Sequence, residues 1–241
     1  MPNTYFQFKQ FRIDQKKSGM KVTTDACLFG AWIAQQINER ENEPSHILDI
    51  GTGTGLLTLM LGQVTKQSRL DAVEMNLEAF QEASQNFKDS KWSDRLHCFH
   101  SPVQEFKTDH KYDLIICNPP FFGKNQKGDQ SKKNLALHSD ALSMEELSNA
   151  IAHHITNTGM AYVLYPEWEM KAFVKWMEKQ GLSVNHSMSI RNKEGSAVFR
   201  QMCQFSRNNS SFQETELFIR DSDGHYSDEF NQILKYYYLE Y

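Results

Sequence analysis

The stretch Asp49-Ile50-Gly51-Thr52-Gly53-Thr54-Gly55 decides the fold, and it closes a short apolar run that begins at His46. Three glycines at alternate positions let a backbone turn tightly and come close to a ligand. The apolar residues from Leu56 onward predict a helix directly after the turn, and Glu74 stands after the next strand-like run, residues 69–73. A strand, a glycine turn, a helix and then an acidic residue predict a nucleotide-binding sheet of the α/β class.

Strand-like and helical segments alternate outward from this loop, which predicts a mostly parallel sheet with helices on both faces. Thr24 or Asp25 is expected to cap the first helix, residues 143–146 have the capping-box pattern of a later one, and Gly159 is expected to end it. The last three strands follow one another directly, so antiparallel pairings are expected there. The expected helices are 24–39, a helix from 56, 76–89, 143–155 and 167–180, and the expected strands are 46–50, 69–73, 96–100, 112–117, 160–165, 182–190, 196–205 and 213–220.

Length and composition favour one globular domain, residues 1–241. The chain has 241 residues, 39% of them hydrophobic, which suffices for a full core. We expect an N-terminal extension with a helix (1–45), a cofactor-binding core (46–165), and the rest of the sheet with a tail (166–241). No apolar run is long enough to span a membrane and the first ten residues do not resemble a secretory signal, so a cytoplasmic protein is expected. The four cysteines are too widely spaced for a zinc site, and no metal is expected: Cys27, Cys98, Cys117 and Cys203.

The charge distribution is uneven. A net charge of −4 argues against binding nucleic acid by bulk electrostatics. Residues 1–24 are nevertheless basic, and so is the segment after Pro120. If the two segments meet near one site, they would form a local positive rim, although lysines that solvate two loops explain the pattern equally well. The lysines of the second segment are Lys124, Lys127, Lys132 and Lys133.

The spacing of the glycines bears on the cofactor. Dinucleotide-binding loops read Gly-x-Gly-x-x-Gly, whereas Gly51, Gly53 and Gly55 are followed by Leu56 where that pattern has its third glycine. This departure favours S-adenosylmethionine over a nicotinamide cofactor. Asp49 can lie near the positively charged methionine end and Glu74 can accept both ribose hydroxyls. Helix-start amides and the hydroxyls of Thr52 and Thr54 are additional donors.

A second motif, Asn118-Pro119-Pro120-Phe121, follows the strand-like run 112–117. An exocyclic amine on a purine is a poor nucleophile because its lone pair is delocalised into the ring. If the Asn118 side-chain oxygen and the Pro119 carbonyl each accept one amine hydrogen, the lone pair can point at a methyl donor. The tandem prolines preset the carbonyl direction, and Phe121 offers a face for base stacking. We therefore take these four residues as the candidate catalytic site, with Asn118 also beside the cofactor.

In these two motifs the chain resembles the class I S-adenosylmethionine-dependent methyltransferases. Several further segments are similar to the bacterial tRNA1(Val) adenine-37 N6-methyltransferase family over essentially the whole length. The segments are Phe6-Gln7-Phe8-Lys9-Gln10-Phe11, Lys21-Val22-Thr23-Thr24-Asp25, Leu28-Phe29-Gly30-Ala31-Trp32, Asn118-Pro119-Pro120-Phe121-Phe122 and Gly224-His225-Tyr226-Ser227 with Phe230.

The resemblance implies a Rossmann-like fold with a mostly parallel seven-stranded sheet and antiparallel end strands. It also implies N6-methylation of the adenine just 3′ of a valine tRNA anticodon, with tRNA as partner and S-adenosylmethionine as cofactor. Residues 21–25, with Thr24 and Asp25, would form a lid over the cofactor, although a simple helix entry explains them nearly as well. One departure concerns Pro102, which stands where such enzymes usually carry an aspartate for the cofactor's adenine; Gln104, Glu105 or a backbone group would substitute.

Three alternatives stay open. Guanine N2-methyltransferases of ribosomal RNA share Asn-Pro-Pro-Phe, but commonly carry a second methyltransferase-like half. Glutamine methyltransferases of release factors share Asn-Pro-Pro-Tyr, but usually have an N-terminal helical domain, for which the 45 residues before the first strand leave little room. A non-catalytic protein that binds the cofactor and RNA is the third, and the intact Asn118 motif weighs against it.

Overall fold

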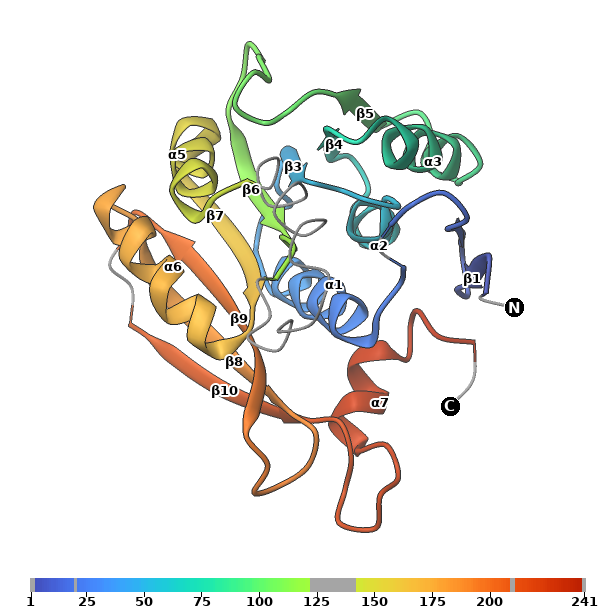
Figure 1. The fold of residues 1–241 in the computed structure, drawn as a ribbon, viewed down its shortest axis with the longest axis vertical. Coiled ribbons are helices and arrows are strands. Elements are labelled where there is room, and N and C mark those ends of the chain that lie inside the picture. Colours follow the sequence, from blue (N-terminus) through green and yellow to red (C-terminus); the bar gives the residue numbers. More distant parts are fainter. Residues whose placement is uncertain (1–2, 20, 122–141, 209–210, 240–241) are drawn as a thin grey trace, which may run out of the picture.

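A computed structural model describes residues 3–19, 21–121, 142–208 and 211–239 (Figure 1). A short antiparallel hairpin near the N-terminus precedes a large central sheet flanked by helices. The hairpin is β1 (Tyr5–Gln7) and β2 (Arg12–Asp14). The sheet strands are β3 (His46–Ile50), β4 (Arg69–Glu74), β5 (Leu96–His100), β6 (Tyr112–Cys117), β7 (Ile155–Tyr165), β8 (Ser183–Arg191), β9 (Val198–Ser206) and β10 (Gln213–Phe218). The helices are α1 (Thr24–Asn38), α2 (Leu56–Val64), α3 (Leu77–Lys88), α5 (Met144–His154), α6 (Glu167–Lys179) and α7 (Asp228–Leu234).

The central sheet has eight strands within the described residues, in the order β10-β8-β9-β7-β6-β3-β4-β5. The expected parallel core is confirmed, but two details were wrong. The sheet has one strand more than the seven that the family resemblance implies, and its eight strands correspond to the eight segments that the sequence predicted. Only β9 of these strands runs against the others, because β8 and β9 form a hairpin and β9 inserts between β7 and β8. That insertion leaves the outer edge of β8 free, and β10 pairs with it in parallel.

Helices cover both faces of the sheet. On one face α1, α2, α3 and α7 pack around Trp32, Met60 and Phe87. On the other face α5 and α6 pack around Ile151 and Phe173. Figure 1 shows α5 and α6 on one side of the strands and α1 and α2 on the other. Burying both faces explains why the central strands are continuously apolar rather than alternating.

Local signals set the helix ends. Ser143 and Glu146 form the expected capping box at α5. At α1 the cap is Thr23, one residue before the expected Thr24 or Asp25, and its side chain accepts the Ala26 amide. Gly159 does not end α5. That helix stops at His154 and β7 starts at Ile155, because the β-branched residues there favour a strand.

The two ends of the described chain lie side by side, as Figure 1 shows. The Lys9 amide donates to the Tyr237 carbonyl at 2.8 Å, and the rings of Phe6 and Phe8 lie 5.7 and 6.1 Å from that of Tyr238. The Tyr237 hydroxyl is buried and donates to the Met60 carbonyl of α2. The aromatic residues at both ends therefore pack as one cluster against the α1–α2 face.

The order of the strands brings the expected functional segments to one edge of the sheet. The chain runs outward from β3 to β5 and then crosses back to β6 on the other side of β3, so a topological switch point lies between β3 and β6. Ligands of open α/β sheets bind beyond the carboxyl ends of the strands at such a point. Ile50 pairs with Cys117 in register. The glycine loop and the Asn118 loop therefore leave the sheet side by side.

No helix in the described part of the chain is long and apolar enough to cross a membrane.

Candidate functional site

The glycine loop has the backbone conformation that requires glycine. Gly51, Gly53 and Gly55 have φ values of 69°, 58° and 84°, a region that other residues adopt only at a cost of about 1–2 kcal/mol. The amides of Gly51 and Thr52 both donate to the Val73 carbonyl, which fixes the loop to the end of β4. A Cβ atom at Gly51 or Gly53 would meet no described atom within 4 Å. The backbone there borders open space that a ligand can fill.

Asp49 is a buried carboxylate with one unused oxygen. The hydroxyls of Thr52 and Thr58 donate to its Oδ2 at 2.6 and 2.8 Å. Its Oδ1 is buried and has no hydrogen-bond partner among the described residues. Burial raises the pKa of Asp49 to about 6, although the two hydroxyls oppose the shift. A buried carboxylate oxygen without a donor suits a cationic ligand group.

Glu74 links the second strand to the glycine loop. Its Oε2 accepts the Gly53 amide and its Oε1 accepts the Asn76 amide, both at 2.9 Å. Each carboxylate oxygen has a further lone pair, so the side chain can still receive two hydroxyl donors. The exposed side chains of Met75 and Leu77 follow directly. No local sequence pattern singles out these two apolar residues, although exposed apolar side chains beside the acid expected to bind the ribose suit the flat face of a cofactor base.

The loop after β5 has Pro102 at the position where the family resemblance leads us to expect an aspartate for the cofactor's adenine. Pro102 is half-buried. Gln104, one of the expected substitutes, donates to Glu146 of the α5 capping box at 3.2 Å. The exposed His100 ring at the end of β5 is stacked on Phe80, with ring centroids 5.2 Å apart.

Asn118 occupies the switch point between β3 and β6. Its side-chain oxygen is buried and has no hydrogen-bond partner in the part of the chain that the structure describes. A buried acceptor without a donor costs about 1–3 kcal/mol unless a ligand or water satisfies it. Pro119 is buried, Pro120 is exposed and Phe121 is half-buried. The motif therefore presents an acceptor that an incoming amino group can use.

Phe121 belongs to a cluster that sequence reasoning missed. The Arg200 guanidinium lies 4.3 Å from the centre of its ring, a cation–π contact. The Arg200 Nε donates in turn to Asp25 Oδ2 at 2.7 Å. From the first turn of α1, Asp25 thus holds Arg200 over residues 118–121, which we call the reaction loop because it carries the candidate catalytic motif. Residues 25 and 200 are too far apart in the sequence for any local pattern to pair them.

Hydrogen bonds to α3 hold the N-terminal segment, residues 14–18, beside the glycine loop, and we call this segment the strap. The amides of Lys16, Lys17 and Ser18 all donate to the Glu82 carboxylate, at 2.6 to 3.0 Å. Asn86 exchanges hydrogen bonds with the Asp14 backbone and donates to the Thr54 carbonyl. The expected lid, residues 21–25, starts directly after this strap.

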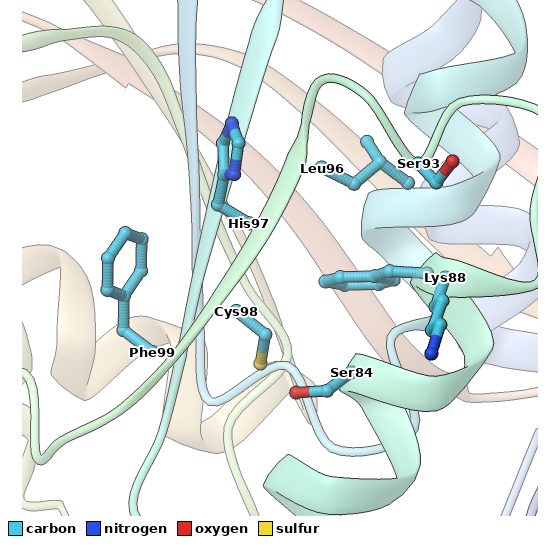
Figure 2. A pocket seen from close by; sticks show the side chains of 8 residues that line it. Ser84, Lys88, Ser93, Leu96, His97, Cys98 and Phe99 are labelled. Carbon is cyan, nitrogen blue, oxygen red and sulfur yellow. The ribbon is translucent and has the colours of Figure 1, made fainter.

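A further cavity of about 380 Å³ lies between α3 and the edge strand β5 (Figure 2). Figure 2 shows Cys98 of β5 and Ser84 of α3 facing each other across it. Burial raises the pKa of the Cys98 thiol to about 12, so this cysteine stays protonated. None of the expected site residues lines this cavity.

The structure bears only in part on the expected basic rim and on the expected lack of a metal site, because it does not describe every residue. The basic segment with Lys124, Lys127, Lys132 and Lys133, and Phe122, lie outside the described residues. Within the described ranges no three His, Cys, Asp or Glu side chains gather in a way that could hold a metal ion.

The glycine loop provides a stability test with a matched control. A Cβ at Gly55 would lie 2.5 Å from the Phe87 ring. Gly55→Ala should therefore lower the free energy of unfolding by about 2–4 kcal/mol, from the left-handed conformation and the overlap together. Gly53→Ala has the same backbone strain without the overlap and should cost about 1–2 kcal/mol. Urea unfolding measures both free energies. Equal losses of stability in the two variants would show that the Phe87 ring moves aside without cost.

The strap can be tested by proteolysis. Glu82→Gln removes the charge that holds three amides, and hydrogen bonds to charged groups contribute about 1.5–3 kcal/mol. Trypsin should then cleave after Lys16 and Lys17 about tenfold to a hundredfold faster, because cleavage follows the population of the opened segment. Glu78→Gln, on an exposed position of the same helix, is the matched control. Equal cleavage of both variants would mean that Glu82 does not hold the segment.

Comparison with known proteins agrees with this geometry. The family model for the methyltransferase small domain matches residues 31–144. A protein of Dyadobacter fermentans named tRNA1(Val) (adenine(37)-N6)-methyltransferase is 38% identical and aligns over 99% of both chains. Proteins with the same name from Flavobacterium psychrophilum and Vibrio campbellii are 38% and 37% identical over 98% of this chain, and cover 99% and 95% of their own lengths.

Solved structures resemble the chain in fold. A protein of Agrobacterium tumefaciens described as a predicted O-methyltransferase has a TM-score of 0.65 at 11% identity, over 87% of this chain and 95% of its own. A ribosomal protein L11 methylase of Lactobacillus delbrueckii subsp. bulgaricus has a TM-score of 0.57 at 15% identity, over 82% and 84%. At such identities the likeness shows the fold alone, and it confirms the expected fold class. The full-length relatives show more, and the chain belongs to the tRNA1(Val) (adenine(37)-N6)-methyltransferase family.

Proposed function

We propose that the protein transfers a methyl group from S-adenosylmethionine to the N6 nitrogen of an adenine in tRNA. The observation that carries the proposal is the buried, unpartnered Oδ1 of Asn118 at the switch point of the sheet. The names of the full-length relatives support both the base and the RNA class. For the position we propose the adenine that these names number 37, in a valine tRNA, with the protein acting in the cytoplasm.

The glycine loop fits the cofactor. The side chains of Asp49 and Glu74 stand at the ends of adjacent strands, β3 and β4. Asp49 Oδ1 would meet the positively charged methionine part, and Glu74 would accept ribose hydroxyls while it keeps its two amide bonds. The open space at Gly51 and Gly53 lets the backbone lie against the ligand. Once bound, S-adenosylmethionine supplies an electrophilic methyl group on sulfur.

The Asn118 loop would prepare the acceptor nitrogen. Asn118 Oδ1 and the Pro119 carbonyl accept the two amine hydrogens, which draws the nitrogen lone pair out of conjugation with the ring. The tandem prolines restrict the backbone before the base arrives, so less reorganisation remains at the moment of reaction. The methylated nitrogen is acidic enough to release a proton to water. No general base is therefore required, and none is assigned.

Phe121 and Arg200 would receive the flipped adenine. Base stacking on an aromatic ring contributes about 1–3 kcal/mol, comparable to the cost of extruding a base. Arg200 keeps the ring in place through its cation–π contact, and Asp25 keeps Arg200 in place. We infer from these contacts that Asp25 acts on the substrate side of the reaction loop, in addition to the lid role expected for residues 21–25.

The proposal is tested by offering the purified protein three methyl acceptors with labelled cofactor. The acceptors are total tRNA from cells that lack the endogenous activity, ribosomal RNA from the same cells, and a release factor. Label in tRNA is the expected result. Label in ribosomal RNA would favour the guanine alternative and label in the release factor the glutamine alternative. No label in any of them, with RNA still bound, would favour the non-catalytic one.

A further inference from the structure

A second pocket opens at the same edge of the sheet, on the other side of the reaction loop from the glycine loop. It has a volume of about 310 Å³, at the lower end of the range for sites that hold small ligands. Three parts of the fold contribute to it: the first turn of α1, the loop after β8 with the start of β9, and the segment after β10. Its lining includes Thr24, Asp25, Asn192, Phe199, Arg220 and Tyr226.

The pocket is connected to the reaction loop by two contacts. Asp25, which lines it, accepts a hydrogen bond from Arg200, and Arg200 covers the ring of Phe121. The strand pairing explains this proximity: β9 is antiparallel to β7, so Gln201, which follows Arg200, lies beside Tyr165 at the carboxyl edge. Only Asp25 and Arg200 would therefore separate a group in the pocket from Phe121, a spacing that suits neighbouring nucleotides.

Arg220 gives the pocket a planar platform. Its guanidinium lies 4.9 Å from the centre of the Tyr226 ring, and its Nη1 donates to the Gly224 carbonyl at 2.6 Å. Tyr226 is stacked in turn on the fully buried Phe230, with ring centroids 4.4 Å apart and nearly parallel planes. The guanidinium thus lies against Tyr226, and Phe230 fixes the position of that ring. Bases of single-stranded RNA stack on such guanidinium planes.

The remaining groups suit the edges of a base. Phe199 is apolar. The Asp25 carboxylate accepts hydrogen bonds, whereas the Thr24 hydroxyl and the Asn192 side-chain amide can both donate and accept them. Asp25 is already paired with Arg200, so its carboxylate offers the edge of a base its remaining lone pairs rather than a free charge. Anticodon-loop nucleotides are unpaired and can be turned outward. We propose that this pocket binds the base of a nucleotide next to the target adenine, an inference that rests on the proposed function.

The test measures tRNA affinity with wild-type protein and with Arg220→Ala. Full-length valine tRNA is prepared intact or with one abasic site, either 5′ or 3′ of the target adenine. Affinity is read by fluorescence anisotropy with S-adenosylhomocysteine present, and methyl transfer is read separately. With wild-type protein, one of the two abasic sites should weaken binding about tenfold, as expected for one lost stacked base. With Arg220→Ala, intact tRNA should bind about tenfold more weakly, and the same abasic site should then add less than twofold.

Lys193→Ala is the matched control, because it removes one positive charge from the adjacent loop outside the pocket. Lys193→Ala should weaken the binding of intact and abasic tRNA by the same factor, so the tenfold effect of the abasic site should remain. Asn192→Ala is the second variant, and it serves if Arg220→Ala does not fold. It keeps the Arg220 stack but should reduce the effect of the abasic site. The inference is overturned if neither abasic site weakens wild-type binding by at least twofold. It is also overturned if the abasic site weakens binding to Arg220→Ala and to Asn192→Ala by the same factor as it weakens binding to wild-type protein, which is the result expected for Lys193→Ala.

Because affinity is measured without turnover, these results are separable from the proposed reaction. Tight tRNA binding with the expected coupling but no methyl transfer would refute the reaction and keep the pocket. Methyl transfer without the coupling would refute the pocket and keep the reaction.

Discussion

Asn118→Ala should lower kcat about a hundredfold to a thousandfold and leave the Kd for S-adenosylmethionine within about twofold. The expected size follows from other sites, where loss of one preorganised hydrogen-bonding group costs about 10²–10³ in rate. The side-chain oxygen is buried beside the end of β3 and has no partner among the described residues. Alanine removes this acceptor, so only the Pro119 carbonyl would remain to orient the amine. Single-turnover methylation and calorimetric cofactor titration measure the two quantities independently.

Asn118→Asp is the informative comparison, because it keeps an acceptor oxygen at the same place. It should retain more activity than alanine. Unchanged turnover in Asn118→Ala would show that the amine is not activated there. A parallel loss of cofactor affinity would instead mean that the residue shapes the cofactor site.

The second large effect concerns Asp49. The pKa of this carboxyl is raised from 3.8 to about 6 by burial, so the folded protein binds a proton more tightly than the unfolded chain does. Its contribution to stability is therefore complete below about pH 4 and is lost as the pH rises through 6. The loss is about 3 kcal/mol. Asp49→Asn does not titrate, so its free energy of unfolding should lack this fall between pH 4 and pH 7.

Cofactor affinity should show the opposite trend. A cationic ligand favours the ionised carboxylate, so the Kd for S-adenosylmethionine should fall about tenfold between pH 5 and pH 7. Asp49→Asn should flatten this dependence and weaken binding at pH 7 by about tenfold to a hundredfold, since the unpaired Oδ1 is the oxygen that would face the cation. Calorimetry at several pH values measures both effects. A wild-type Kd that does not change with pH would show that the Asp49 carboxylate does not contact the positively charged part of the cofactor.

The sequence predicted the parts of this site that depend on neighbouring residues. The alternate glycines from Gly51 to Gly55, the acid after the next strand and the Asn-Pro-Pro-Phe loop are each local patterns, and the switch point then places them at one edge because parallel strands share it. The family resemblance was confirmed by the full-length relatives. The assignment of individual cofactor and catalytic residues stays a prediction until variants are measured.

The parts that were missed depend on distant pairings. The contact of Arg200 with Asp25 and the contact of Lys16, in the strap, with Glu82 join residues that no periodicity relates. The hairpin β1–β2 is too short for alternation to reveal it. The place of β10 was also beyond local reasoning, because strand propensity does not say which edge of a sheet is free. Long-range packing decided each of these features.

The most direct test of the proposed reaction is to locate the methyl group. Valine tRNA from cells without the endogenous activity would be incubated with the wild-type protein and cofactor, digested with a base-specific nuclease and sequenced by mass spectrometry. A single added methyl group is expected, recovered as N6-methyladenosine at the adenine directly 3′ of the anticodon. Methylation of a guanine, or of adenines elsewhere in the tRNA with that position unmodified, would contradict the assignment.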